Sequence, residues 1–394
     1  MLSDKNILIG ICGGIAAYKT AELVRSLKKQ SAAVRVMMTA AARQFIHPLT
    51  FETLSEEPVL TDLFASELKP ATVHIDWARW ADLILICPAT LNTIGKIANG
   101  IADNAVTTTL FASQVPVLFC PAMNKAMVEH PAYIQNEKRL IETGYEIVTP
   151  AAGYLACGEY GPGRLANIEE IIDSIRISLC PTRDLEGKRL LITAGPTREA
   201  IDPVRYLSNH SSGKMGYALA ERARCRGAQV HLISGPVNLR PFRGVETTRV
   251  NSAEEMYKAV HDRFSSCDIF ISAAAVSDYR AKEISDQKIK KEKGLPVIEL
   301  TENPDILASL PKNRSQIVVG FSVETDDLID HSIAKIKNKN LDFIVANNPS
   351  EQGAGFDVDT NKVTIIDKMG GIDSLPLMSK LEVADRILDR STGK

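Results

Sequence analysis

Two regions of the sequence place a glycine-bearing loop between a short apolar run and an amphipathic segment. Residues 7–11 lead through Gly13 and Gly14 into a helical pattern, and residues 190–193 lead through a long polar loop to Gly216 and a second helical pattern. A strand followed by a helix N-terminus presents free backbone N–H groups that bind anions. The repeated pattern therefore predicts two α/β domains, each with its own small-molecule site.

Small or polar residues also stand near the ends of other predicted strands in the first half. Thr39, Thr90 and Asn124 each come soon after an apolar run. Ligands of a doubly wound sheet bind beyond the carboxyl ends of its strands. These residues therefore predict an edge that a phosphate or a flat ring can approach closely.

Two residues of the first half have side chains suited to acid–base chemistry. His74 precedes a strong strand, and Cys157 lies in a loop with three glycines. Taken alone, such a histidine is more often a surface or hydrogen-bonded side chain, and such a cysteine is more often an inert thiol. An exposed thiol in a glycine-rich loop is also suited to delivering a proton, so both interpretations stay open.

The loop before Gly216 is rich in hydrogen-bond donors. The donors are Arg198, Arg205, Asn209, His210, Ser211, Ser212 and Lys214. A phosphate-binding P-loop needs glycine at position 208 and serine or threonine at 215, where this chain has Ser208 and Met215. The dinucleotide fingerprint Gly-x-Gly-x-x-Gly is also missing. The composition favours an anionic substrate over a merely solvated loop, since structureless loops of this length are usually functional.

A lysine-rich segment follows the strand predicted for residues 268–272. On an extended backbone Lys288 and Lys290 share one face and Ile289 takes the other. A lysine run is usually a solvated face, but this one comes soon after an alanine-rich strand end that a nucleotide can approach. A phosphate clamp is therefore the alternative, and Asn303 is expected to open a helix shortly afterwards.

Composition excludes several classes of protein. The chain has 394 residues and a formal net charge of -2, so it lacks the excess of basic residues typical of proteins that bind nucleic acid or a membrane surface. Its seven cysteines are dispersed, without Cys-x-x-Cys, as in reduced cytosolic proteins. No apolar run reaches the roughly 18 residues of a membrane span. These features predict a cytoplasmic protein that acts on small molecules.

Strands alternate with helices along the whole chain. Strands are predicted at residues 7–11, 34–38, 83–87, 117–120, 190–193, 230–234, 268–272, 316–321, 341–346 and 362–367. Residues 180–187 lack periodicity and contain a proline and a terminal glycine, which indicates a linker. The fold class is therefore α/β, with two doubly wound, Rossmann-like parallel-sheet domains in tandem at residues 1–183 and 184–394.

Four motifs of the first half together resemble the flavin-dependent cysteine decarboxylases, and within them the phosphopantothenoylcysteine decarboxylases. The motifs are Gly13-Gly-Ile-Ala-Ala-Tyr-Lys19, Pro88-Ala-Thr90, Pro121-Ala-Met-Asn124, and Ala156-Cys-Gly158 with Gly161-Pro-Gly-Arg164. The resemblance implies a flavodoxin-like domain that binds FMN, which supplies an electron sink for the loss of CO₂. The implied flavin-binding residues are Gly13, Gly14, Ile15, Ala16, Thr39 and Thr90. Leu91 departs from the alanine common in relatives.

The same resemblance implies roles for three side chains. His74 would be the base or orienting group near the flavin, Asn124 would bind the substrate carboxylate, and Cys157 would donate a proton to the ene-thiolate left by CO₂. Relatives build this site between the subunits of a trimer, which implies that His74 and Cys157 come from neighbouring subunits.

Motifs of the second half resemble the phosphopantothenate–cysteine ligases. They include Ala194-Gly-Pro-Thr-Arg-Glu199, Asp202-Pro-Val-Arg-Tyr206, Ser208-Asn-His-Ser-Ser-Gly-Lys-Met-Gly216, Ala274-Ala-Val-Ser-Asp-Tyr279, Lys288-Ile-Lys-Lys291 and Asn303-Pro-Asp-Ile306. The resemblance implies CTP as co-substrate, with Mg²⁺ bound through its phosphates, and an acyl-cytidylate intermediate. The implied nucleotide-binding residues are Ser272, Ala273, Ala274, Asp278, Lys288, Asn303, Pro304, Asp305, Ile306, Phe321, Lys335 and Lys339.

The ligase resemblance also implies residues that contact the acyl substrate. Arg205, Asn209 and Ala275 would bind phosphopantothenate or its cytidylate, with Asn209 and Lys288 as catalytic residues. The segment Gly320-Phe-Ser-Val-Glu-Thr325 departs from the usual Gly-Phe-Ala-Ala-Glu-Thr.

The order of the two halves resembles bacterial bifunctional enzymes of coenzyme A biosynthesis. These form trimers through the flavin half and dimers through the ligase half, hence a dodecamer. Two rival hypotheses are a chain with one active half and a flavin-binding regulatory subunit without catalysis.

Overall fold

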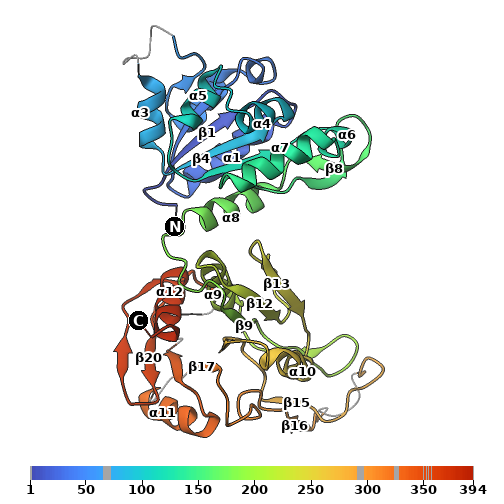
Figure 1. Ribbon diagram of the computed structural model, residues 1–394. Helices are drawn as coiled ribbons and strands as arrows, with labels where there is room; N and C mark the ends of the chain where they lie inside the picture. Colours follow the sequence, from blue (N-terminus) through green and yellow to red (C-terminus); the bar gives the residue numbers. More distant parts are fainter. Residues whose placement is uncertain are drawn as a thin grey trace. The chain divides into compact units, whose positions relative to one another are not determined.

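The computed structural model describes residues 2–64, 72–290, 297–323, 328–348, 350, 351, 353, 355 and 357–393. The chain divides into two compact units, Met1–Cys180 and Pro181–Lys394, and each is described by itself (Figure 1). No helix or strand occupies residues 179–188, and the expected boundary between residues 183 and 184 falls within this segment. Lys291 and residues 324–325 of the quoted motifs lie outside the described residues.

The N-terminal unit contains a parallel sheet of six strands in the order β3-β2-β1-β4-β5-β6. Its strands are β1 (Asn6–Ile11), β2 (Ala33–Met38), β3 (Val59–Leu60), β4 (Leu83–Ala89), β5 (Val117–Pro121) and β6 (Glu146–Ile147). Without the two-residue strand β3, the order is the 2-1-3-4-5 of flavodoxin-like sheets, with the switch point between β1 and β4. The predicted fold class is confirmed in this unit.

Helices cover both faces of this sheet because its strands are apolar on both sides. In β1, Ile7 and Ile9 face one core and Leu8 faces the other. One face is covered by α1 (Ala17–Lys29), α2 (Pro48–Ser55) and α8 (Ile168–Ser178). The other is covered by α3 (Val73–Trp80), α4 (Leu91–Ala98), α5 (Ala105–Phe111) and α7 (Pro131–Glu142). The short helix α6 (Lys125–Val128) follows β5. A hairpin of β7 (Ala151–Tyr154) and β8 (Tyr160–Arg164) follows β6.

The C-terminal unit contains an eight-stranded sheet in the order β13-β12-β9-β14-β17-β18-β20-β21. Its strands are β9 (Arg189–Ala194), β12 (Gln229–Ser234), β13 (Val245–Arg249), β14 (Ile269–Ser272), β17 (Ile317–Val323), β18 (Phe343–Asn347), β20 (Thr364–Asp367) and β21 (Ile372–Ser374). The first six are parallel in Rossmann order, and β20 and β21 are antiparallel additions. One face packs on α9 (Lys214–Cys225) and α12 (Lys380–Ser391), the other on α10 (Ala253–Phe264) and α11 (Leu328–Lys339).

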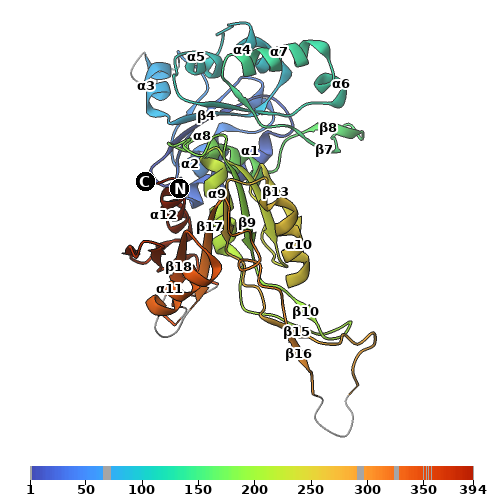
Figure 2. The same cartoon turned by 60° about the horizontal axis from the view of Figure 1, so that its bottom comes forward.

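Short two-stranded pairs complete the C-terminal unit. They are β10 (Glu199–Ala200) with β11 (Tyr206–Leu207), β15 (Tyr279–Ala281) with β16 (Leu300–Glu302), and β19 (Thr360–Asn361) with β22 (Met378–Ser379). Figure 2 shows β10, β15 and β16 extending beyond the end of the main sheet.

Two segments of this unit lack regular structure, and at one of them, Asn303, the sequence predicted a helix that does not form. Residues 288–290 form no strand, although their exposure alternates as expected. The N–H of Ile289 donates to the Asp202 carboxylate, and its carbonyl accepts from Arg205. The backbone of this segment is therefore hydrogen-bonded to side chains and not to another strand. No helix follows Asn303: residues 306–309 form only a turn, and the N–H of Asn303 itself donates to the carbonyl of Asp278.

The remaining long elements agree with the sequence analysis. All ten predicted strands lie in the two sheets, as β1, β2, β4, β5, β9, β12, β14, β17, β18 and β20, and all seven cysteines are free thiols. Within the described ranges, every helix is too short or too polar to cross a bilayer.

Candidate functional sites

A cavity of about 970 Å³ lies at the carboxyl ends of the N-terminal strands. All six predicted flavin-binding residues line it, and so do Asn124 and Cys157. Apolar side chains supply much of the wall: Ile15, Leu91, Met123, Met127 and Leu165. Leu91, where the sequence departs from its relatives, thus belongs to the apolar surface that a flat ring would contact.

The start of α1 provides the anion-binding part of this cavity. No side chain caps the helix at Ala16, so its first N–H groups have no side-chain acceptor. Gly13 fits only without a side chain, since an added Cβ would lie 2.4 Å from the Cβ of Ala41. Burial, and then the charge of Arg164, lower the pKa of the Lys19 ammonium. Two close cations beside a helix N-terminus fit a phosphate group, and with the apolar wall they fit FMN.

The structure brings Asn124 and Cys157 together. Asn124 caps α6, where its Oδ1 accepts from the N–H of Ala126 at 2.7 Å, and its Nδ2 lies 3.6 Å from the Sγ of Cys157. Gly163 fixes the hairpin here, because its carbonyl accepts from Met123 N–H at 2.9 Å and an added Cβ would meet the Met123 carbonyl oxygen at 2.1 Å. Cys157 is exposed at the hairpin turn.

Another cysteine close to this region differs in character. Cys12 follows β1 directly and is fully buried. Burial raises the pKa of its thiol to about 11, with hydrogen bonds involving Thr93 and Thr90 opposing the rise. Cys12 is therefore an inert thiol, whereas Cys157 is accessible to a substrate.

His74 does not line the cavity of its own chain. It lies on α3, which packs Val73 and Trp77 into the core. The sequence motif around His74 gave no information on the direction in which α3 faces, because the sheet can be covered on either side.

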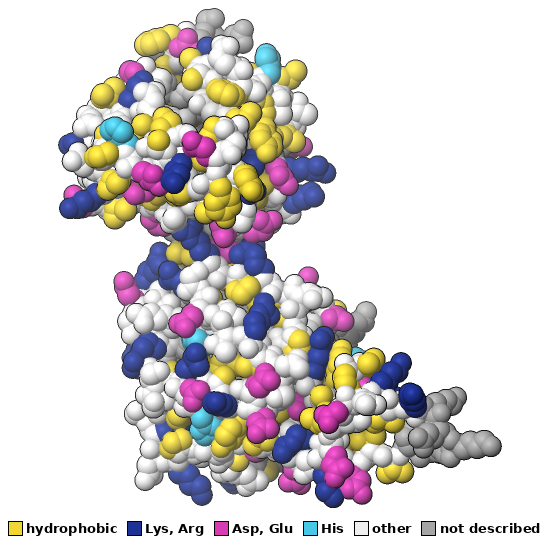
Figure 3. Space-filling model, turned by 90° about the vertical axis from the view of Figure 1, so that its right-hand side faces the viewer, with side chains coloured by type: hydrophobic (Ala, Val, Ile, Leu, Met, Phe, Trp, Pro, Cys, Tyr) yellow, Lys and Arg dark blue, Asp and Glu magenta, His cyan; other side chains and the backbone are white. Residues whose placement is uncertain are grey.

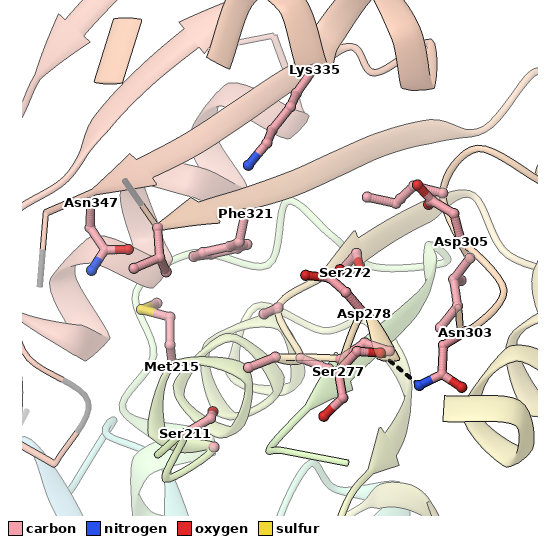
Figure 4. A pocket seen from close by; sticks show the side chains of 18 of the residues that line it. Ser211, Met215, Ser272, Ser277, Asp278, Asn303, Asp305, Phe321, Lys335 and Asn347 are labelled. Atoms are coloured by element: carbon pink, nitrogen blue, oxygen red, sulfur yellow. Dashed lines mark hydrogen bonds between the residues drawn. The ribbon is translucent and has the colours of Figure 1, made fainter. Parts of the chain in front are cut away.

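A second cavity, of about 610 Å³, lies at the carboxyl ends of the C-terminal strands. Figure 4 shows polar side chains from several elements pointing into it. All the predicted nucleotide-binding residues except Lys288 line this cavity, together with Ala275: Ser272, Ala273, Ala274, Asp278, Asn303, Pro304, Asp305, Ile306, Phe321, Lys335 and Lys339.

Hydrogen bonds fix several of these side chains in place. Asn303 donates to the carbonyl of Ser277 at 2.8 Å, and Lys335 donates to Ser322 Oγ at 3.0 Å (Figure 4 marks the first). Lys339 pairs with Asp305 at 2.9 Å. Burial would raise the pKa of Asp305, but the N–H of Ala308 and the Lys339 ammonium hold it below its ordinary value.

The N-terminus of α9 faces this cavity through Ser211, Ser212, Gly213, Lys214 and Met215. Gly213 adopts φ 78° at the helix start, and no side chain caps the helix. Gly216 permits close packing on β9, since an added Cβ would lie 2.5 Å from the Cβ of Ala194. The exposed N–H groups of such a helix start suit a phosphate or carboxylate.

Asn209, Arg205 and Lys288 do not line the cavity. Asn209 lies behind it, where Nδ2 donates to the carbonyl of Ala275 at 2.6 Å and Oδ1 accepts from Ser211 N–H at 3.0 Å. The guanidinium of Arg205 contacts Asp202 through two nitrogens and the carbonyl of Ile289 at 2.9 Å. The hydrogen bond from Arg205 holds the pKa of Asp202 far below its usual range.

Several cavity residues were missed by the sequence analysis. They include Ser277, Met215, Asn347, Asn361 and Lys380. Lys380 is only 6% exposed, and burial followed by the charge of Lys214 lowers its pKa. The sequence signal at this position is the capping pair Ser379 and Glu382, which predicts a helix start but no ligand.

Within the described part of the chain, no group of three or more His, Cys, Asp or Glu side chains is arranged to hold a metal ion. Neither cavity therefore provides a protein-only metal centre from these residues. A metal ion bound through the phosphates of a ligand is compatible with the cations and helix N-terminus described above.

Two family models match the chain, one over each half. Residues 1–179 match the Flavoprotein family, and residues 185–393 match the family described as DNA/pantothenate metabolism flavoprotein C-terminal domain. The coenzyme A biosynthesis bifunctional protein CoaBC of Bacillus subtilis is 48% identical over 392 residues, which are 98% of this chain and 97% of that protein. Its namesake in Vibrio cholerae is 46% identical over 98% of both chains.

A solved structure of the C-terminal domain of a CoaBC protein is also similar, with 42% identity, a TM-score of 0.47, and coverage of 54% of this chain and 97% of that one. The matches to the two bacterial proteins extend over nearly the whole chain and both of its units. The chain therefore belongs to the family of coenzyme A biosynthesis bifunctional proteins, with a flavoprotein domain followed by a DNA/pantothenate metabolism domain.

Proposed function

We propose that the C-terminal unit condenses 4′-phosphopantothenate with cysteine and that the N-terminal unit decarboxylates the product to 4′-phosphopantetheine. Family membership supports this pair of activities. The observation that carries the proposal is the pair of cavities at equivalent edges of two sheets, one with an apolar wall beside a thiol, the other lined by lysines around a helix N-terminus.

In the N-terminal unit, the proposed decarboxylation depends on an electron sink. Bound FMN would supply it by taking up a hydride equivalent as the cysteinyl thiol becomes a thioaldehyde, and would return that hydride after CO₂ has left, so that the net change is loss of CO₂ alone. The amide of Asn124 holds the substrate carboxylate beside Cys157. The thiol of Cys157 then protonates the ene-thiolate carbon. Lys19 and Arg164 bind the phosphate of the cofactor at the start of α1.

In the C-terminal unit, the carboxylate of phosphopantothenate requires activation, because a carboxylate is a poor acyl electrophile. Attack on the α-phosphate of CTP gives an acyl-cytidylate and pyrophosphate, and the cysteine amine then displaces CMP. Lys335 and Lys339 offset the charge of the triphosphate, with Mg²⁺ bound to the phosphates. Lys288, which does not line the cavity, promotes turnover of the acyl-cytidylate.

We further propose that the N-terminal site is completed by a neighbouring copy of the chain, which supplies His74 from α3. Large hydrophobic side chains are exposed on this unit, including Ile15, Tyr18 and Leu49, and on the face drawn in Figure 3 hydrophobic side chains gather over it. Mixed oligomers of His74→Asn and Cys157→Ser chains should recover decarboxylation that neither variant has alone. Absence of recovery in mixed oligomers would reject a shared site.

The proposed function is tested by incubating purified protein with Mg-CTP, 4′-phosphopantothenate and cysteine. Pyrophosphate should appear first and CO₂ should follow, in a protein with the absorption spectrum of a flavin. Pyrophosphate without CO₂ would favour a chain with one active half, in which the flavin domain only assists assembly. Flavin binding without either product would favour a regulatory subunit.

A further inference from the structure

The loop that carries Cys157 also carries a carboxylate that the proposed reaction does not use. Leu155 N–H donates to the Glu159 carbonyl at 2.8 Å, and Gly158 N–H donates to the Leu155 carbonyl at 3.0 Å. Gly158 adopts φ 83°, which favours glycine. The tight turn places the side chains of Cys157 and Glu159 against the same partner, Asn124.

The three side chains are in mutual contact. The thiol of Cys157 donates to Glu159 Oε2 at 3.7 Å, and Asn124 Nδ2 donates to the same oxygen at 3.2 Å. Asn124 Nδ2 also lies 3.6 Å from Cys157 Sγ. The amide proposed to bind the substrate carboxylate therefore holds a carboxylate of the protein itself.

The sign of the neighbouring charge distinguishes two uses of a cysteine. A nucleophilic cysteine is flanked by cations or a helix N-terminus, which stabilise its thiolate. Here the charged group in hydrogen-bond contact with the sulfur is a carboxylate, which repels a thiolate and accepts the S–H hydrogen. Such surroundings suit a thiol that must keep its proton until an acceptor arrives.

We infer that Glu159 is a positioning residue that accepts the S–H of Cys157 and disfavours attack by its sulfur, so that Cys157 acts as an acid and not as a nucleophile. This inference rests on the proposed decarboxylase function. When the substrate carboxylate takes the Asn124 amide, Glu159 stays beside the sulfur. After CO₂ leaves, the S–H bond breaks, a C–H bond forms on the ene-thiolate carbon, and the resulting Cys157 thiolate takes a proton from water.

The first test is the alkylation rate of Cys157 in the full-length protein, without substrates. The probe is iodoacetamide at fixed pH, with the Cys157 peptide quantified by mass spectrometry. Glu159→Gln removes the charge at constant shape and should raise the rate about three- to tenfold, whereas Glu159→Asp should stay near the wild type. Glu129→Gln is the matched control, since Glu129 lines the same surface depression as Glu159 and pairs with Lys125 at 3.9 Å.

The second test is turnover of 4′-phosphopantothenoylcysteine. Glu159→Gln should lower kcat about tenfold with accumulation of the ene-thiol product of CO₂ loss, because the thiol is no longer held in position for proton transfer, and Glu159→Asp should restore most of kcat. Equal alkylation rates in Glu159→Gln and wild type, or equal kcat losses in Gln and Asp variants, would overturn the inference. If the wild-type protein released no CO₂, the proposed function would be rejected. The alkylation rates would still test the contact between Glu159 and Cys157, because that measurement does not require turnover.

Discussion

The two units share a strand order around their sites and differ in how the first strand connects to the first helix. In the N-terminal unit β1 reaches α1 through residues 12–16, whereas in the C-terminal unit β9 reaches α9 through residues 195–213, which include β10 and β11. The short connection leaves a broad cavity with an apolar wall. The long one brings Lys214 to the cavity and Asn209 behind it.

This difference explains how related sheets serve unlike ligands. The sheet edge and the helix N-terminus recur in both units and supply the anion-binding amides. The residues of the loops determine whether the rest of the cavity wall suits a flat ring or a triphosphate. Changes to loop residues should therefore affect one activity and spare the other.

The largest effect is expected from Cys157→Ser in the N-terminal unit. The variant should retain flavin and the CTP-dependent release of pyrophosphate, but its formation of 4′-phosphopantetheine should fall about 10²- to 10⁴-fold, as for loss of a general acid. The decarboxylated ene-thiol should accumulate and can be detected by mass spectrometry. Normal 4′-phosphopantetheine output would remove Cys157 from the mechanism.

Lys288→Gln is the counterpart in the C-terminal unit. Ligase turnover should fall about 100-fold, in the range seen when a group that stabilises transition-state charge is removed, and acyl-cytidylate should accumulate. Lys290→Gln, in the same exposed segment, should have little effect. Unchanged turnover in both variants would show that these lysines form only a solvated face.

Gly163→Ala tests whether the hairpin must be docked at Met123. The added Cβ would meet the Met123 carbonyl oxygen at 2.1 Å, and φ of Gly163 is 121°. Displacement of Cys157 from Asn124 should lower decarboxylation at least tenfold, since small errors in position are costly in catalysis. Gly158→Ala is the control, because it has φ 83° but nothing within 4 Å. Equal activities of the two variants would contradict the importance of docking.

The smallest effect is expected from Asp202→Asn. The carboxylate accepts the N–H of Ile289 at 3.1 Å and pairs with Arg205, so its neutralisation should loosen the segment that carries Lys288. Amide hydrogen exchange at Ile289 should accelerate severalfold. Asp342→Asn removes a comparable carboxylate, bonded to Arg314 and to Val318 N–H, and should leave this exchange unchanged. If exchange at Ile289 in Asp202→Asn stayed as slow as in the wild type, the Asp202 carboxylate would not be what holds the segment of Lys288.

The sequence predicted the parts of the fold that depend on apolar periodicity. Ten strands of the two sheets follow from apolar runs, because parallel strands covered on both faces are apolar throughout, whereas β3, β6, β13 and β21 were not predicted. The hairpin that carries Cys157 was not predicted, since its glycines and tyrosines lack a strand pattern. The alternation around Ile289 was expected from the sequence, but a period of two does not reveal that Asp202 and Arg205 are the partners of this segment.

The candidate sites likewise include residues that a local sequence pattern locates and residues whose position depends on tertiary packing. Residues at the carboxyl ends of strands, such as Thr90 and Ser272, line the cavities because the sheet edge fixes their position. The location of His74 depends on which face α3 covers, and that of Lys380 on the packing of the last helix. Neither is encoded in a local pattern.

The central claim is that one chain both makes and decarboxylates the cysteine conjugate. The most direct measurement uses cysteine labelled in its carboxyl carbon, together with Mg-CTP and 4′-phosphopantothenate, and follows labelled CO₂ and pyrophosphate in one reaction. The account predicts one CO₂ for each pyrophosphate, after a lag in which the conjugate accumulates. Pyrophosphate release without labelled CO₂, from protein that contains flavin, would contradict it.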